Sequence, residues 1–164
     1  TFIGGALCAL IIESVIPSSQ DSLYWTLTAF LPLLLALSSA AGNQAAAVTV
    51  EAILSGRISP QDTWRHLIHE ILLGTVSGLV FGGLTYITSW LIGNGAGMSS
   101  FVGIVLFFQI LVAMFLGTLI PLSLKKLNLD PTVATVSVFT TISHISTVIC
   151  LFAIAYRFFQ PLAA

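Results

Sequence analysis

The stretch DPTVATVSVFTTISHISTVICLFAIAY, residues 130–156, decides the fold class because it joins a polar half to a lipid-compatible half. Its end, from Ile149 onward, is apolar enough to lie in a bilayer, whereas its beginning carries many hydroxyls and one histidine. At 3.6 residues per turn, one side of a helix collects Ser137, Thr140, Thr141 and His144. Ionisable groups at membrane depth are costly and usually functional, so this side is expected to face water, an ion or a partner helix. The alternative is that the hydroxyls bond to carbonyls one turn earlier.

Composition places the chain among membrane proteins. Of its 164 residues, 57% are hydrophobic and 7% are charged, and the mean hydropathy is +1.05, far from the values of soluble domains. A net charge of −1 without a basic cluster excludes a nucleic-acid partner. We therefore expect residues 1–164 to form one transmembrane domain in a lipid bilayer. Because the chain starts at Thr1, it reads as part of something longer.

Five apolar runs predict an all-α membrane protein with five transmembrane helices. They cover residues 2–16, 24–54, 71–90, 101–122 and the second half of the stretch quoted above, with an uncharged loop at 93–100. The second run has about 31 residues, or roughly 46 Å of helix against a hydrocarbon core near 30 Å, so it must tilt, bend or emerge. Pro32 favours a bend. The fourth run is expected to end at Pro121 and the basic turn of Lys125 and Lys126.

The basic residues predict the orientation. Arg57 and Arg65 lie in the second loop and Lys125 and Lys126 in the fourth, while the first and third loops have none. The positive-inside rule makes the basic loops cytoplasmic, which puts the N-terminus in the cytoplasm and the C-terminus outside. We expect a multi-pass protein of the plasma membrane, in a prokaryote the inner membrane.

Several polar residues have alternative interpretations. Asn43 and Gln44 interrupt a small-residue stretch, 38–49, and are either interhelical hydrogen-bond partners or oxygen ligands for a hard cation. His66, His69 and Glu70 form H-L-I-H-E, which lacks the spacing of a zinc hydrolase, so no enzyme is predicted. That segment is expected to be a water-facing entrance to the third span, with Glu70 just inside it.

Two features of the later spans predict helix packing. Glycines at residues 74, 78 and 82 form a groove along one helix face, which is expected to pack against another helix. Gln109 is the lone polar side chain of the fourth span. It is expected to make an interhelical hydrogen bond and not to belong to a functional site.

Two segments together resemble the MgtE family of magnesium channels and their solute-carrier relatives. PLLLALSSAAGNQAAAVTVEAILSGRIS is similar to the second-helix signature, and GTLIPLSLKKLNLDPTVATVSVFTTISH to the signature of the fourth and fifth helices. The resemblance covers nearly the whole chain and agrees in order, spacing, span number and orientation. It implies a homodimer with a cation pore between the second and fifth helices of both subunits. It also implies a cytoplasmic regulatory region before Thr1.

The chain departs from the family pattern at positions that matter for ions. Where the family has Gly-Gly-Asn, this sequence has Ser-Ser-Ala at residues 38–40, and His144 replaces the Asp that would hold hydrated magnesium. Asp130 and Glu70 do match family acids, and Thr140 matches the family's small residue. The resemblance thus implies the candidate metal ligands His144, Asn43, Thr140, Asp130 and Glu70.

Three functions remain open from the sequence. Magnesium prefers oxygen ligands, whereas imidazole suits zinc or cobalt, so His144 favours a divalent-cation transporter of altered selectivity. At low pH His144 would instead carry a positive charge and repel cations, since an unperturbed histidine titrates at about pH 6.5. A second possibility is magnesium transport through Asn43, Thr140 and backbone oxygens alone. The third is a non-conducting membrane anchor or sensor, which the polar stripe disfavours.

Overall fold

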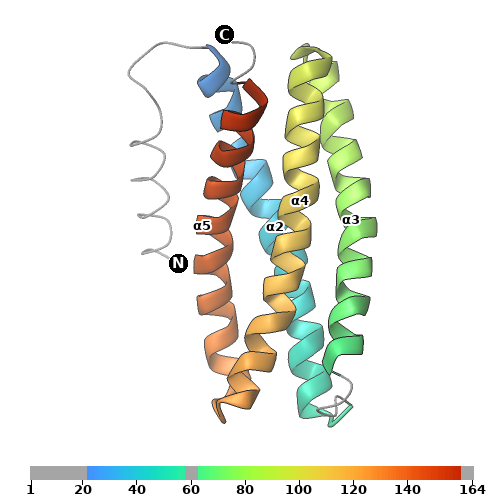
Figure 1. Cartoon of the computed structure of the whole chain (residues 1–164), viewed down its shortest axis with the longest axis vertical. Coiled ribbons are helices and arrows are strands. Elements are labelled where there is room, and N and C mark those ends of the chain that lie inside the picture. The colour runs from blue at the N-terminus through green and yellow to red at the C-terminus, as the bar shows by residue number, and fades with distance from the viewer. Residues whose placement is uncertain (1–21, 58–62, 160–164) are drawn as a thin grey trace.

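The computed structural model describes residues 22–57 and 63–159, and within them the chain is entirely helical. Its helices are α2 (Ser22–Leu54), α3 (Thr63–Leu91), α4 (Gly95–Lys126) and α5 (Pro131–Phe159), and they run lengthwise beside one another (Figure 1). The expected first span, residues 2–16, lies outside the described residues, so the count of five remains a prediction.

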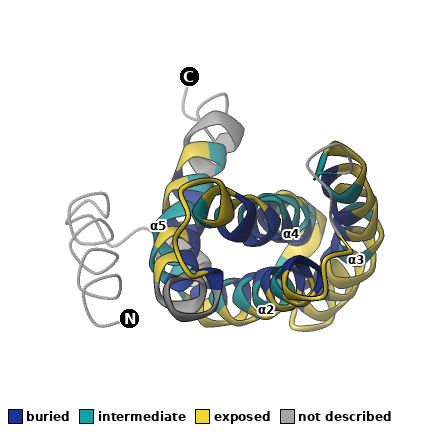
Figure 2. Cartoon of the chain, turned by 90° about the horizontal axis from the view of Figure 1, so that it is seen from below, coloured by how far each residue is buried: buried dark blue, intermediate teal, exposed yellow. Residues whose placement is uncertain are grey.

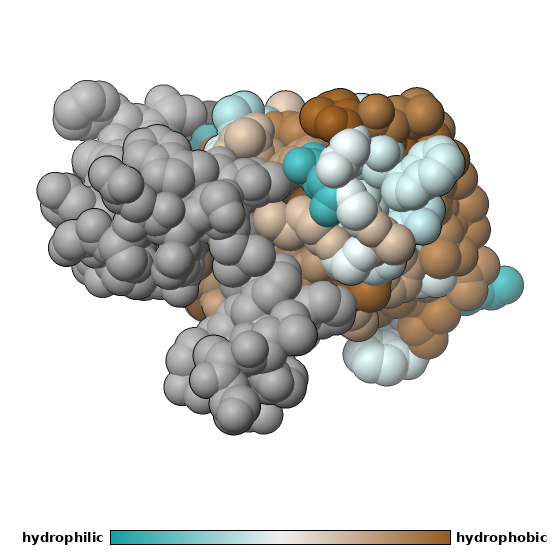
Figure 3. Space-filling model, turned by 90° about the horizontal axis from the view of Figure 1, so that it is seen from above, coloured by the Kyte–Doolittle hydropathy of each residue, from teal (hydrophilic) through white to brown (hydrophobic). Residues whose placement is uncertain are grey.

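Three of the described helices, α2, α3 and α4, are long and apolar enough to cross a membrane. The described apolar part of α5, Val138–Ile154, is shorter. On α3, the exposed side chains are mostly large and apolar, including Leu72, Leu79 and Trp90. The exposed outer side of α3 is visible in Figure 2, and hydrophobic residues cover the α3 and α4 side in Figure 3. This surface is suited to contact with lipid tails.

The turn between α3 and α4 corrects the expected loop at 93–100. Helix α4 begins at Gly95, where the positive φ of 73° suits glycine, and it already includes residues 96–100. Ser99 explains the early start, since its hydroxyl bonds to Ser89 Oγ at 3.2 Å and to Gly95 O at 2.8 Å. The expected end of this helix at the basic turn of Lys125 and Lys126 is confirmed, but Pro121 lies inside the helix. Helix α4 continues to Lys126, because transmembrane helices tolerate an internal proline when neighbouring helices pack against it.

Helix α2 is inclined to the other helices of the bundle (Figure 1). It is one continuous helix of 33 residues with Pro32 inside it, and it crosses the bundle from the side of α5 to the side of α3 (Figure 1). Whether the helix fits a bilayer by tilting, bending or emerging stays a prediction. The inclination within the bundle lets α2 contact α5 along its first half and α3 along its second half.

Glycines set the closest helix contacts, as the groove on α3 predicts. Gly74, Gly78 and Gly82 are buried against α4, and a Cβ added at Gly82 would lie 2.8 Å from Gly103 O. A second crossing joins α2 to α4, where a Cβ on Gly117 would lie 2.3 Å from Gly42 O. The two backbones meet there without room for a methyl group.

Four of the five basic residues gather at one end of the bundle, and Arg157, near the end of α5, belongs to the other end. The end of α2, the start of α3, the end of α4 and the start of α5 all lie at the lower end in Figure 1. Arg57 and Arg65 therefore share an end with Lys125 and Lys126, as expected if the second and fourth loops lie on one side of a membrane.

Candidate cation site

His144, near the middle of α5, faces α2. Its Nε2 lies 3.1 Å from Ser39 Oγ on α2, a hydrogen bond between partly buried side chains. Which atom donates depends on the histidine tautomer. The bond joins the imidazole to a neighbouring helix and positions the ring on the α2 side of α5.

The helix register brings two more predicted residues to this place. Helices α2 and α5 run in opposite directions (Figure 1). Asn43 and Thr140 each lie four residues, or one turn, from the bonded pair, and both lie toward the basic end. Thr140 is buried, as is the Oδ1 atom of Asn43. The structure thus gathers His144, Asn43 and Thr140 into one region between α2 and α5.

A buried hydroxyl and amide cluster lies next to this region. Gln109 Nε2 donates to Thr147 Oγ1 at 2.7 Å, which confirms the expected interhelical bond from Gln109. Ser38 Oγ lies 3.3 Å from the same hydroxyl, and Thr147 donates to Ser143 O at 2.8 Å. The alternative that hydroxyls bond back within their helix is therefore correct for Thr147. The cluster links α2, α4 and α5 inside one chain.

Some buried polar atoms in this region lack a hydrogen-bond partner. Among the described side chains they are Asn43 Oδ1, Gln109 Oε1 and Ser143 Oγ. Buried oxygens of this kind usually bind protein donors, water or a cation. Asn43 Oδ1 is the one that belongs to the predicted ligands.

The two acidic candidates lie elsewhere. Asp130 is exposed in the connection between α4 and α5, about 20 Å along the helix axis from His144. Glu70 is buried in the second turn of α3, where its Oε1 lies 3.9 Å from His69 Nδ1. Both acids are at the basic end, but neither joins the region around His144.

In the part of the chain that the structure describes, no group of three or more His, Cys, Asp or Glu side chains is arranged to hold a metal ion. A metal at His144 would therefore use oxygen ligands of this chain, water or a second copy. One chain therefore offers a metal at this place a single imidazole nitrogen.

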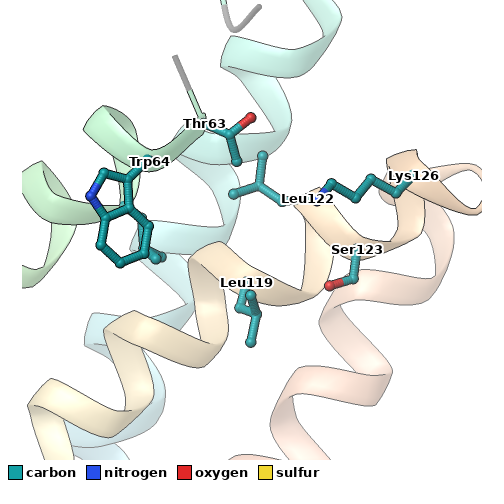
Figure 4. A pocket seen from close by; sticks show the side chains of 7 residues that line it. Thr63, Trp64, Leu119, Leu122, Ser123 and Lys126 are labelled. Atoms are coloured by element: carbon teal, nitrogen blue, oxygen red, sulfur yellow. The ribbon is translucent and has the colours of Figure 1, made fainter. Parts of the chain in front are cut away.

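A pocket of about 270 Å³ at the basic end contains none of the predicted ligands (Figure 4). It lies between the start of α3 and the end of α4 and is lined by Thr63, Trp64, Leu67, Leu119, Leu122, Ser123 and Lys126. The ammonium group of Lys126 repels cations. This lining therefore disfavours the pocket as a cation site.

Long apolar helices around a polar, partly unsatisfied interior define a polytopic membrane protein of the transport class. A family model described as MgtE, divalent cation transporter, matches residues 31–154. The chain therefore belongs to the MgtE divalent cation transporter family.

Two curated relatives agree with this assignment. The magnesium transporter MgtE of Enterococcus faecalis (strain ATCC 700802 / V583) is 29% identical over 159 residues, which cover 97% of this chain and 34% of that protein. The magnesium transporter MgtE of Bacillus subtilis (strain 168) is 27% identical over 155 residues, covering 93% of this chain and 34% of the relative. The chain thus spans about a third of the length of each relative.

Ser39 is the site residue that the sequence argument did not select. The signal was present, because residues 38–40 depart from the family signature just as His144 does. The two departures contact each other across α2 and α5. Only the register of the two helices shows this, since 105 residues separate the two positions.

Proposed function

We propose that this domain moves divalent cations across a membrane along the region between α2 and α5. The observation that carries the proposal is the Ser39 to His144 contact, with Asn43 and Thr140 one turn away. A polar region at mid-helix depth has no use in a simple anchor. The relatives' description as magnesium transporters makes a divalent cation the natural substrate.

The ligand chemistry favours a selectivity different from that of a carboxylate site. Asn43 and Thr140 offer oxygen atoms, which suit magnesium, whereas His144 offers a nitrogen, which suits zinc or cobalt. If the Nε2 proton is donated to Ser39, the lone pair on Nδ1 is left for a metal. A second hydrogen bond of this kind commonly orients a metal-binding imidazole. We propose that His144 shifts preference toward such borderline ions.

We further propose that two copies pair through α2 and α5, so that the pathway lies between subunits. Unlike the outer side of α3, the exposed side of α2 includes several small residues, among them Ala29, Ala36 and Ala47. Small residues let helices approach closely or leave room for water. This difference supports a protein contact at α2 and a lipid contact at α3.

Cysteines placed on α2 test this pairing. In a background without Cys8 and Cys150, Ala36→Cys and Ala47→Cys should form disulfide-linked dimers in membranes under mild oxidation, because equivalent positions would approach across the two-fold axis. Leu79→Cys on the exposed side of α3 is the matched control and should remain monomeric. Equal crosslinking at all three positions, or none at any, would contradict the proposed interface.

We propose that the basic end is cytoplasmic and that Asp130 concentrates cations there by its negative potential. Asp130→Asn should lower cation flux several-fold at about 10 mM salt but little at about 1 M, because the Debye length falls from about 30 Å to about 3 Å. The measurement is flux into liposomes at both salt concentrations. An equal loss at both would indicate a structural role for Asp130.

Flux into liposomes separates transport from the alternative of a non-conducting anchor or sensor. Purified protein should admit magnesium, zinc or cobalt into vesicles loaded with an indicator dye, and empty vesicles should not. The double variant Asn43→Ala/His144→Ala should lose most of this flux while it still inserts. Wild-type protein that is dimeric and inserted but inactive for every divalent ion would support the anchor instead.

A further inference from the structure

A second cavity, of about 330 Å³, lies on the opposite side of α2 from α5. Its polar lining comes from Gln44 on α2 and from His69, Glu70 and Ser77 on α3, and Met114 of α4 is among its apolar lining. None of the lining residues belongs to α5. The cavity is therefore distinct from the region around His144.

Glu70 is the unusual member of this lining. Only 3% of the residue is exposed, and no Lys or Arg in the described chain pairs with it. The 3.9 Å separation from His69 Nδ1 is too long for a hydrogen bond. A buried carboxylate without a hydrogen bond is costly unless a proton or a cation neutralises it.

We propose that this cavity binds a divalent cation through the carboxylate of Glu70, with Gln44 Oε1 and Ser77 Oγ as further oxygen ligands to the ion or its water shell. Hard divalent ions take oxygen ligands and keep several waters when one or two carboxylates hold them. At about 30 Å³ per water molecule, the cavity has room for an ion with most of its first hydration shell.

Neighbouring residues on α2 connect this site to the proposed pathway. Asn43 and Gln44 are adjacent in sequence, so their side chains point about 100° apart around the helix. Gln44 lines the α3 cavity, whereas Asn43 is on the side of Ser39, one turn away. An ion held by Glu70 would thus sit beside the pathway and not within it. The choice of a divalent cation as the bound ion rests on the proposed function. Binding of the ion can nevertheless be measured without any transport.

The experiment counts bound Mn²⁺, used as a paramagnetic probe, on purified wild-type and variant protein by electron paramagnetic resonance titration. Glu70→Gln should remove one site per chain or weaken it at least about tenfold, since it exchanges a carboxylate ligand for a neutral amide. Glu51→Gln is the matched control, because Glu51 is an exposed carboxylate that pairs with Arg57. This control should keep the wild-type number of sites.

A second variant guards against a folding defect. Ala40→Leu leaves every polar group in place but narrows the cavity, and it should reduce binding at the same site. An unchanged number of Mn²⁺ sites in either Glu70→Gln or Ala40→Leu, with the protein still folded, would overturn the proposal. If Mn²⁺ binds through Glu70 while the wild type carries no flux, only the proposed transport function fails.

Discussion

Replacing His144 with aspartate is expected to raise the ratio of magnesium to zinc flux by at least about tenfold, because an oxygen ligand replaces a nitrogen at the proposed site. His144→Ala should instead lose zinc and cobalt flux while some magnesium flux through Asn43 and Thr140 remains. Wild-type flux should also fall as the pH drops through the range in which histidine titrates, since a protonated ring repels cations and offers no lone pair. The aspartate variant should lose much of that fall.

The measurement is a panel of magnesium, zinc and cobalt fluxes into liposomes at several pH values. His66→Ala is the matched control, because His66 also bonds to an α2 hydroxyl, with Nε2 at 3.1 Å from Thr49 Oγ1, but lies at the basic end. It should leave the flux ratio unchanged. If flux of every metal is the same in both His144 variants as in the wild type, His144 is a structural residue, and Asn43 becomes the better candidate ligand.

Gly117→Ala is expected to destabilise the bundle by about 1–3 kcal/mol or more. The added Cβ would lie 2.3 Å from Gly42 O and 3.1 Å from Gly42 C. Both atoms belong to the backbone of α2, so no side-chain rotation relieves the overlap and the helices must separate. Thermal unfolding in detergent measures the effect.

Gly83→Ala is the matched control for Gly117→Ala at the crossing of α2 and α4. Gly83 is also within a helix, but a Cβ there would meet nothing within 4 Å. Alanine forms helices better than glycine by about 1 kcal/mol, so this variant should be neutral or slightly more stable. Equal unfolding temperatures for the two variants would show that the α2 to α4 crossing is looser than the structure has it.

Packing of the helices was partly predictable from sequence. The glycines at 74, 78 and 82 specified the α3 face against α4, because only residues without side chains allow such close backbones. The start of α4 was not predictable in the same way. Glycine and serine usually favour a turn, but hydrogen bonds from Ser99 to Gly95 and Ser89 extend the helix through them.

The candidate site was also only partly predictable from the sequence. Sequence spacing put Thr140 and His144 on one face of α5, since helical periodicity is local. It could not pair His144 with Ser39, because that contact depends on how α2 and α5 slide past each other. The family resemblance also grouped Glu70 with Asp130 as acids of the pattern, whereas the structure buries Glu70 in a cavity against α2.

By itself the sequence determined that this protein is helical and lies in a membrane, and which helix faces are polar, because composition and periodicity act within single segments. The tertiary structure decided which polar faces meet: Ser39 with His144, Gln109 with Thr147, and Gln44 with Glu70 around one cavity. Those pairings follow from the tilt of α2 and from the glycine crossing at Gly42 and Gly117. Both arise only when several helices pack together.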